Sequence, residues 1–302
     1  MLDILMRAGC YVAIIILGYV LRKKNFFPEE TFGVLAKIVI NIALPAAIIA
    51  STAGKPIDAS MLVIALLGMT GGLLKMLLAF LASHRQTREE KAFMVLNVPG
   101  YNIGNFAMPF TQSFLGPMGV LTTSLFDIGN AFVCLGGAFG VATVIKEGKG
   151  FSLWKILKAP LKSVPFLVYV LMAVLNLCRL TLPTPVVSLA EIIGSSNAFL
   201  AMLMIGVGFR LTGDRSQIGK IVKILGIRYS VSTVLALLFY FVLPFPLEIR
   251  QALTLLVFSP IGSAVPAFTG KLKGDTGLSS AVNSVSIICS IVIMVTLLMV
   301  ML

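Results

Sequence analysis

The sequence has little charge for its length. Charged residues make up 12% of the 302 residues and hydrophobic residues 58%, whereas about a quarter of an ordinary soluble domain is charged. The mean hydropathy is +1.01. Together with apolar runs about 20 residues long, this excludes a soluble globular domain and predicts a chain that crosses a membrane several times.

Residues that metal, redox and hydrolytic chemistry requires are also scarce. His84 is the single histidine, and the four cysteines stand isolated in apolar segments with no CxxC pair. The sequence contains no HExxH motif, no Ser/His pairing and no glycine-rich phosphate loop ending in Gly-Lys-Ser/Thr. We therefore expect no disulfide, no metal and no cofactor, and neither an enzyme nor an ATP-driven pump.

The positive net charge does not predict a nucleic-acid partner. The formal charge is +12, but the basic residues form short clusters between apolar runs, as they do in the loops of membrane proteins. The expected partner is membrane lipid. One cluster, FSLWKILKAPLK, interleaves Lys and Trp with Leu and Ile and predicts a short helix lying on the inner leaflet.

Ten apolar runs are long enough to span a bilayer. We expect the first, which lacks the marks of a cleavable signal peptide, to be a span. The ten cover residues 4–21, 31–52, 59–82, 91–115, 118–144, 160–178, 186–209, 218–242, 248–270 and 277–301. Most of the 24 Lys and Arg residues follow odd-numbered spans; the opposite side holds only Arg7, Lys55, Arg179 and Arg250. By the positive-inside rule, both termini are expected outside the cytoplasm.

The fourth and ninth spans carry matching interruptions. A shift of 158 residues places VFSPIGSAVPAF (257–268) over PGYNIGNFAMPF (99–110), and both stretches are rich in Gly, Pro and polar residues. Five spans per half is an odd number, so the halves enter the membrane from opposite sides. The prediction is an all-α fold of ten transmembrane helices. Two inverted five-helix repeats, residues 1–145 and 160–302, are joined by a cytoplasmic linker at 146–159.

A broken helix in a membrane frees backbone groups that need partners, and in transporters such breaks form the substrate site. Pro and Gly make the break, while Asn and Ser supply neutral donors and acceptors. The substrate-binding candidates are Asn102, Asn105, Pro109, Pro260, Ser263 and Pro266. The alternative is a pair of proline-kinked helices with a purely structural role.

Few ionisable side chains lie deep in the predicted spans, where such groups are usually functional. Asp127, with Asn130 nearby, is the candidate for coupling transport to H⁺ or Na⁺. The alternative is a buried structural carboxyl group. Lys75 and Lys37 lie close enough to span ends to reach the interface, so neither is given a role.

The motif N-x-x-x-x-N-x-G-N-x-x-x-P at residues 97–109 resembles that of the auxin efflux carrier family. Asn41-Ile42-Ala43-Leu44-Pro45, the segment 188–211 and the Pro260/Pro266 region are similar to further parts of that family, whose fold the bile-acid/sodium symporters share. The resemblance implies a ten-span, homodimeric carrier of organic acid anions in the cell (inner) membrane, with helices 4 and 9 crossing. It also implies a scaffold of helices 1, 2, 6 and 7, an elevator-like core of helices 3–5 and 8–10, and a substrate-site role for Asn41.

The leading hypothesis is therefore a secondary transporter of a small organic anion such as a carboxylate. A sodium-coupled symporter of the bile-acid type is the first alternative. A channel and an intramembrane enzyme are further alternatives, with less in the sequence to favour them.

Overall fold

The computed structural model of the protein describes residues 2–28, 30–148, 152–210 and 217–302, which are helical and contain no strand. The first half comprises α1 (Leu2–Lys23), α2 (Thr31–Ile38), α3 (Leu44–Thr52), α4 (Val63–Ala82), α5 (Arg88–Asn97), α6 (Met108–Phe114), α7 (Gly116–Phe132) and α8 (Ala138–Glu147). The second half comprises α9 (Leu153–Lys158), α10 (Val164–Leu177), α11 (Thr184–Gly194), α12 (Asn197–Gly208), α13 (Ile218–Phe241), α14 (Leu247–Leu256), α15 (Val265–Lys271) and α16 (Thr276–Met301).

Several of these helices continue into one another through irregular turns. π-Helical turns at Val39–Ala43, Ile103–Ala107 and Val133–Gly137 join α2 to α3, lead into α6 and join α7 to α8. Short 3₁₀ turns at Ala59–Leu62 and Pro160–Lys162 precede α4 and α10. A π-helical turn adds one residue to the helical ladder and is common at functional sites.

Seven helical segments of the described chain are long and apolar enough to cross a membrane, or eight if the bent pair Leu153–Lys162 and Val164–Leu177 counts as one span. They confirm an all-helical, multi-pass membrane protein. The predicted fourth and ninth spans are not among them because neither is one continuous helix: α5 is separated from α6, and α14 from α15.

The linker predicted at 146–159 contains α9, which meets the following helix at a bend of 83°. Trp154 is 65% exposed, and the ammonium of Lys158 lies 4.4 Å from the centre of its ring. Residues 149–151 of this linker, and Leu211 at the end of the segment 188–211, lie outside the described residues.

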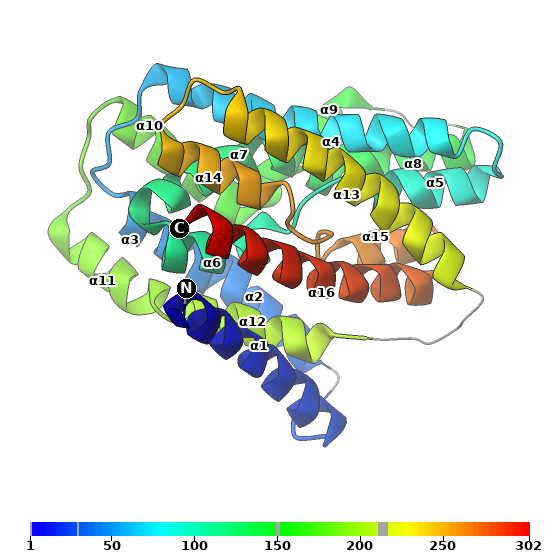
Figure 1. Ribbon diagram of the computed structural model, residues 1–302, viewed down its shortest axis with the longest axis horizontal. Coiled ribbons are helices and arrows are strands. Elements are labelled where there is room, and N and C mark those ends of the chain that lie inside the picture. The colour runs from blue at the N-terminus through cyan, green and yellow to red at the C-terminus, as the bar shows by residue number, and fades with distance from the viewer. Residues whose placement is uncertain (1, 29, 149–151, 211–216) are drawn as a thin grey trace.

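The helices pack in two groups. In one, α1 packs on α12, α12 on α2, and α3 on α10 and α11; in the other, α4 packs on α7 and α13, α5 on α8, α14 on α13, and α15 on α16. Figure 1 shows α1, α11 and α12 on the lower side of the molecule and α4, α13 and α14 on the upper side, with α16 between them. Both chain ends lie close together in this view.

Glycine allows the closest helix pairs to approach. A Cβ on Gly206 of α12 would lie 2.1 Å from the carbonyl oxygen of Ile15 in α1, and one on Gly129 of α7 would lie 1.7 Å from that of Ala65 in α4. Such contacts leave no room for any other residue. Small residues at helix interfaces are typical of membrane proteins, in which packing rather than water exclusion holds helices together.

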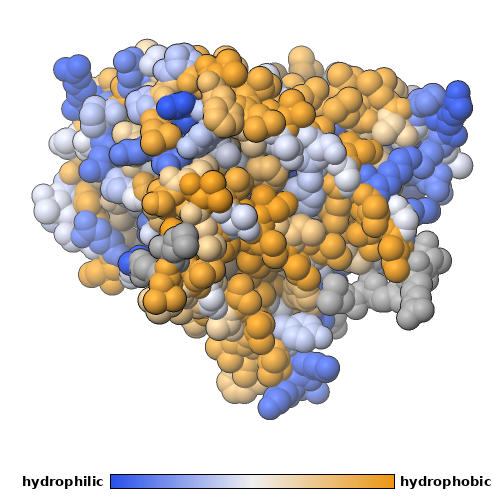
Figure 2. All heavy atoms as spheres, in the orientation of Figure 1, coloured by the Kyte–Doolittle hydropathy of each residue, from blue (hydrophilic) through white to orange (hydrophobic). Residues whose placement is uncertain are grey.

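The outer surface fits a bilayer. Large apolar side chains of α1, α4, α10 and α13 are exposed, among them Ile16, Leu66, Leu171 and Leu237. Figure 2 shows apolar residues over much of the visible face, with hydrophilic residues toward its left and right margins and at the lower tip. Exposed apolar surface of this extent requires a lipid environment.

Candidate functional site

The first interruption, between α5 and the turn at Ile103, leaves several backbone groups without helical partners. Asn130 of α7 replaces two of them, since its side-chain oxygen accepts from the N–H of Tyr101 (3.0 Å) and its amide donates to the Tyr101 carbonyl (2.9 Å). Arg228 of α13 donates to the carbonyls of Val98 and Gly100, both at 2.7 Å. Gly100 has φ +76°, a backbone conformation that favours glycine.

The second interruption, between α14 and α15, is satisfied in the same way. Arg228 donates to the carbonyls of Ser259 (2.5 Å) and Pro260 (3.0 Å). The remaining partners come from α4, α13 and α16: Lys75 and Ser232 donate to the Val257 carbonyl, Ser290 donates to that of Phe258, and Ser286 accepts from the N–H of Ile261. Buried backbone at membrane depth is tolerated when protein groups replace the lost hydrogen bonds in this manner.

The two interruptions touch each other. The N–H of Asn102 donates to the carbonyl of Pro260 at 2.9 Å, and the side-chain amide of Asn105 donates to the hydroxyl of Ser263 at 3.2 Å. The residues of the second pair are 158 positions apart, and the same separation relates Asn102 to Pro260. Residues that align when the sequence is shifted by 158 positions are thus in contact in the structure.

One cavity beside this contact has a volume of about 150 Å³. We call it the α10 cavity. Polar side chains of both interruptions, of α7 and of α10 line it: Asn102, Asn105, Asp127, Asn130, Tyr169 and Ser263. The Asn130 amide also donates to the carboxylate of Asp127 at 2.8 Å. The helix formed by Ile103–Phe114 begins at this cavity, so its first N–H groups and positive dipole end lie there.

A second cavity, of about 240 Å³, also borders the contact. Asn102 and Ser263 line this one too, together with Pro266, Asn283, Arg22 and Arg210, and we call it the α1 cavity. The guanidinium of Arg22 donates to the carbonyls of Val207 (3.0 Å) and Phe209 (3.3 Å) at the end of α12. The two cavities therefore share an asparagine and a serine of the crossing.

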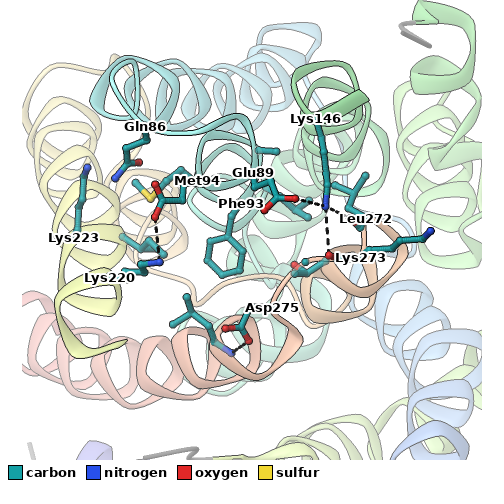
Figure 3. Close-up of a pocket in the computed structure, with 17 residues that line it drawn as sticks. Gln86, Glu89, Phe93, Met94, Lys146, Lys220, Lys223, Leu272, Lys273 and Asp275 are labelled. Atoms are coloured by element: carbon teal, nitrogen blue, oxygen red, sulfur yellow. Dashed lines mark hydrogen bonds and ion pairs between the residues drawn. The ribbon is translucent and has the colours of Figure 1, made fainter. Parts of the chain in front are cut away.

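A third cavity, also about 240 Å³, lies away from the crossing among the ends of α5, α8, α13 and α15. Figure 3 shows Lys146 pointing toward Glu89 and toward the backbone of Leu272 and Lys273. Ion pairs join Lys146 to Glu89 at 3.7 Å and Lys220 to Glu90 at 3.2 Å. These charges bind one another and neighbouring carbonyls, whereas the side-chain oxygen of Gln86 in the same lining has no hydrogen-bond partner among the described residues. The cavity lies where helix ends meet and not at the crossing.

The candidate residues are not all placed alike. Asn102, Asn105, Asp127, Asn130 and Ser263 come together at the α10 cavity, and Pro266 lines the α1 cavity. Pro260 supplies its carbonyl to the crossing. Pro109 is buried in α6, where its carbonyl accepts a hydrogen bond from Tyr11 of α1, which also contacts Ser113. Asn41 is exposed, donates to the Lys37 carbonyl and lines neither cavity.

Two buried basic residues, Lys75 and Arg228, also lie at the crossing. Lys75 does not reach the interface as expected: it is fully buried, its ammonium donates to Val257 at 3.3 Å and lies 4.0 Å from the centre of the Tyr101 ring. Arg228 is also fully buried, with its guanidinium 5.4 Å from the same ring. Their positions inside predicted spans three and eight are the sequence signal for a role at this site, because ionisable residues deep in a membrane are usually functional.

Comparison with known proteins supports a membrane transporter. The sequence model of the family described as "Membrane transport protein" matches residues 10–149, which include the first interruption, Asp127 and Asn130. A protein of Methanothermobacter thermautotrophicus described as an uncharacterized transporter is 26% identical over 243 residues, which cover 78% of this chain and 77% of that protein.

An all-helical membrane fold, a span-four motif of asparagines and prolines, and a transporter relative along most of the chain point to the same class of protein. The chain is similar to membrane transport proteins: residues 10–149 match that family's model, and most of the chain resembles a transporter.

Proposed function

We propose that the protein is a secondary carrier of a small organic anion, such as a carboxylate, which binds in the α10 cavity at the crossing. Asn105 carries the proposal: it is 7% exposed, lines the cavity, and its side-chain oxygen has no hydrogen-bond partner among the described residues. The Asn105 amide donates one of its two N–H groups to Ser263, so the other can donate to a carboxylate oxygen, while the unpaired side-chain oxygen can accept from a hydroxyl or protonated carboxyl group of the same ligand.

An anion fits this cavity better than a cation or a neutral apolar molecule. The side-chain amides of Asn102 and Asn105, the Ser263 hydroxyl and the first N–H groups of the helix at Ile103 all supply donors. The nearby carboxyl of Asp127 is the single acidic side chain in the cavity lining. Neutral donors at a helix N-terminus hold a carboxylate without the cost of burying a compensating charge.

The meeting of Asn102 with Pro260 and of Asn105 with Ser263 supports an inverted repeat of five helices per half. A pseudo-two-fold axis in the membrane plane would bring equivalent residues together at the midplane. The ten-helix arrangement follows if α5–α6 and α14–α15 each count as one broken span.

The packing supports an elevator-type mechanism. The group α1, α2, α3, α10, α11 and α12 forms the proposed scaffold, and the other group, with both interruptions, forms the moving core. Both cavities lie between the two groups and reach residues beside the basic helix ends, Arg22 and Ser163. On the opposite side Tyr11 closes on α6. This arrangement fits the cytoplasm-facing state of a homodimeric carrier in the cell membrane.

A ligand screen tests the proposal. Purified wild-type protein, Asn105→Ala and the matched control Asn41→Ala are heated with a panel of mono- and dicarboxylates, because a bound ligand raises the unfolding temperature. At least one carboxylate should stabilise the wild type and the control. Loss of hydrogen bonds to a charged ligand should weaken its binding to Asn105→Ala by about 10- to 100-fold. Equal stabilisation of all three proteins would move the site elsewhere.

A further inference from the structure

Arg228 has an unusual set of partners for a buried arginine. Its side chain is fully buried in the middle of α13, and its two terminal nitrogens donate to four backbone carbonyls. Two carbonyls belong to the first interruption and two to the second. No ion pair of Arg228 is found within the part of the chain that the structure describes.

The surroundings of Arg228 are those of a bound cation. Helices α5 and α14 both end at the interruptions, so their negative dipole ends and unpaired carbonyls converge on the guanidinium. In other transporters with broken helices, such carbonyls coordinate the coupling cation. A guanidinium remains charged even when buried and offers five donors in a planar fork, which suits several oxygens at once.

We propose that Arg228 is the resident cation of the crossing. Its guanidinium occupies the position between the two helix ends that a bound metal cation would otherwise fill, and it holds the interruptions together throughout transport. One consequence, which rests on the proposed carrier function, is that substrate movement requires no Na⁺. Coupling to H⁺ through Asp127 remains compatible with this role.

The resident cation also divides the crossing into two chemically different faces. The carbonyl ends of α5 and α14 face Arg228, whereas the side chains of Asn105 and Ser263 and the beginning of the helix at Ile103 face the α10 cavity. Substrate and Arg228 therefore do not compete for the same groups. Arg228 is a positioning residue: it acts on substrate through the backbone that carries Asn102 and Asn105.

This role can be tested without a substrate by removing the Arg228 side chain and supplying free guanidinium ion in its place. Arg228→Ala leaves the four carbonyls around a space that a free guanidinium ion can enter. The unfolding temperature is measured in low millimolar guanidinium chloride and in equal choline chloride, for the wild type, Arg228→Ala and the control Arg250→Ala. Arg250 is a suitable control because its guanidinium also donates to a carbonyl, that of Tyr240, but away from the crossing.

In choline chloride, Arg228→Ala is expected to unfold at a lower temperature than the wild type. Guanidinium chloride should raise the unfolding temperature of Arg228→Ala by about 3 °C or more, and should not raise that of the wild type or of Arg250→Ala. No response to guanidinium, or an equal response of the control, would overturn the proposal. If Arg228→Ala cannot be purified, the unfolding temperatures of Arg228→Lys and Arg228→Met are compared instead. The lysine variant, which keeps the positive charge, should be the more stable. A methionine variant of equal or greater stability would contradict the proposal that a cation is required at this position.

The Na⁺ consequence has its own measurement. Uptake by wild-type proteoliposomes of a carboxylate found in the ligand screen should be the same in sodium and in choline media, and a tenfold loss in choline would contradict it. If no carboxylate binds or moves, the proposed function fails, whereas the guanidinium experiment still decides the role of Arg228.

Discussion

At the scale of single residues, the crossing depends on side chains that replace lost helical hydrogen bonds. Asn130 binds both backbone groups of Tyr101 and also the carboxylate of Asp127. It therefore links the shape of the first interruption to the one acidic group of the α10 cavity. A change in the protonation of Asp127 would alter its hydrogen bond with Asn130, and Asn130 in turn binds the backbone beside Asn102.

This link makes Asp127 testable as the coupling residue. Asp127→Asn preserves the shape of the side chain but removes its charge and its titration. We expect the variant to fold and to bind the carboxylate, and to lose any dependence of uptake on external pH that the wild type shows. The measurement is initial uptake rate against pH in proteoliposomes. A pH dependence that survives the substitution unchanged would make Asp127 a structural residue.

The asparagines and prolines could be identified from the sequence because polar and helix-breaking residues stand out in an apolar run. The partners of Lys75 and Arg228 could not. Each contacts carbonyls of the interruption in the other half of the chain: Lys75 that of Val257, and Arg228 those of Val98 and Gly100. Contacts between segments so distant in sequence are set by tertiary packing, and a long basic side chain is compatible with either the interface or the interior.

At the scale of elements, the interruptions are tightly packed as well as hydrogen-bonded. Cys134, in the π-helical turn between α7 and α8, lies against both of them. A Cβ on Gly262 would lie 2.8 Å from the sulfur of Cys134, and one on Gly100 would lie 3.3 Å from it. The glycines thus allow one cysteine side chain to fit between the two broken helices.

Gly262→Ala should therefore destabilise the protein by about 1–3 kcal/mol through overpacking. The sulfur of Cys134 is the close neighbour, and the next atom is 3.8 Å away, so adding Cys134→Ala should restore most of the lost stability. Gly226→Ala in α13 is the control, because its Cβ would meet no atom within 4 Å. Unfolding temperatures of the three variants decide this; a double variant no more stable than Gly262→Ala would show that the contact is not responsible.

Hydrophobic run length predicted the seven long spans well, because a bilayer imposes both length and composition. It predicted less about the interrupted spans. The existence of breaks at 99–110 and 257–268 could be inferred from Gly and Pro, but the replacement of their hydrogen bonds by Ser286, Ser290 and Asn130 depends on how α7 and α16 pack beside them.

At the scale of the whole molecule, the helix ends rich in Lys and Arg gather together. Lys146 reaches the carbonyl of Leu272, Lys220 pairs with Glu90, and Lys223 donates to the carbonyl of Ala82. Lys146, Lys220 and Lys223, which follow the predicted fifth and seventh spans, thus lie together with the segments that follow the third and ninth spans. That this end faces the cytoplasm stays a prediction of the positive-inside rule.

Thiol labelling tests the orientation. In a variant whose four native cysteines are replaced by alanine, single cysteines are placed at Lys23, Lys271 and Lys55, all exposed. An impermeant maleimide should label Lys23→Cys and Lys271→Cys from the cytoplasmic side only, and Lys55→Cys from the outside. Labelling of the first two from outside intact cells would reverse the proposed topology.

The central claim is that an organic anion is carried at the crossing of the two interrupted spans. Counterflow tests it most directly: proteoliposomes loaded with an unlabelled carboxylate are diluted into a trace of the same labelled compound. Wild-type protein and Asn41→Ala should accumulate label transiently above equilibrium, as a carrier does, while Asn105→Ala should show little accumulation. Counterflow by Asn105→Ala equal to that of the wild type, or equilibration without overshoot in all three proteins, would contradict the account.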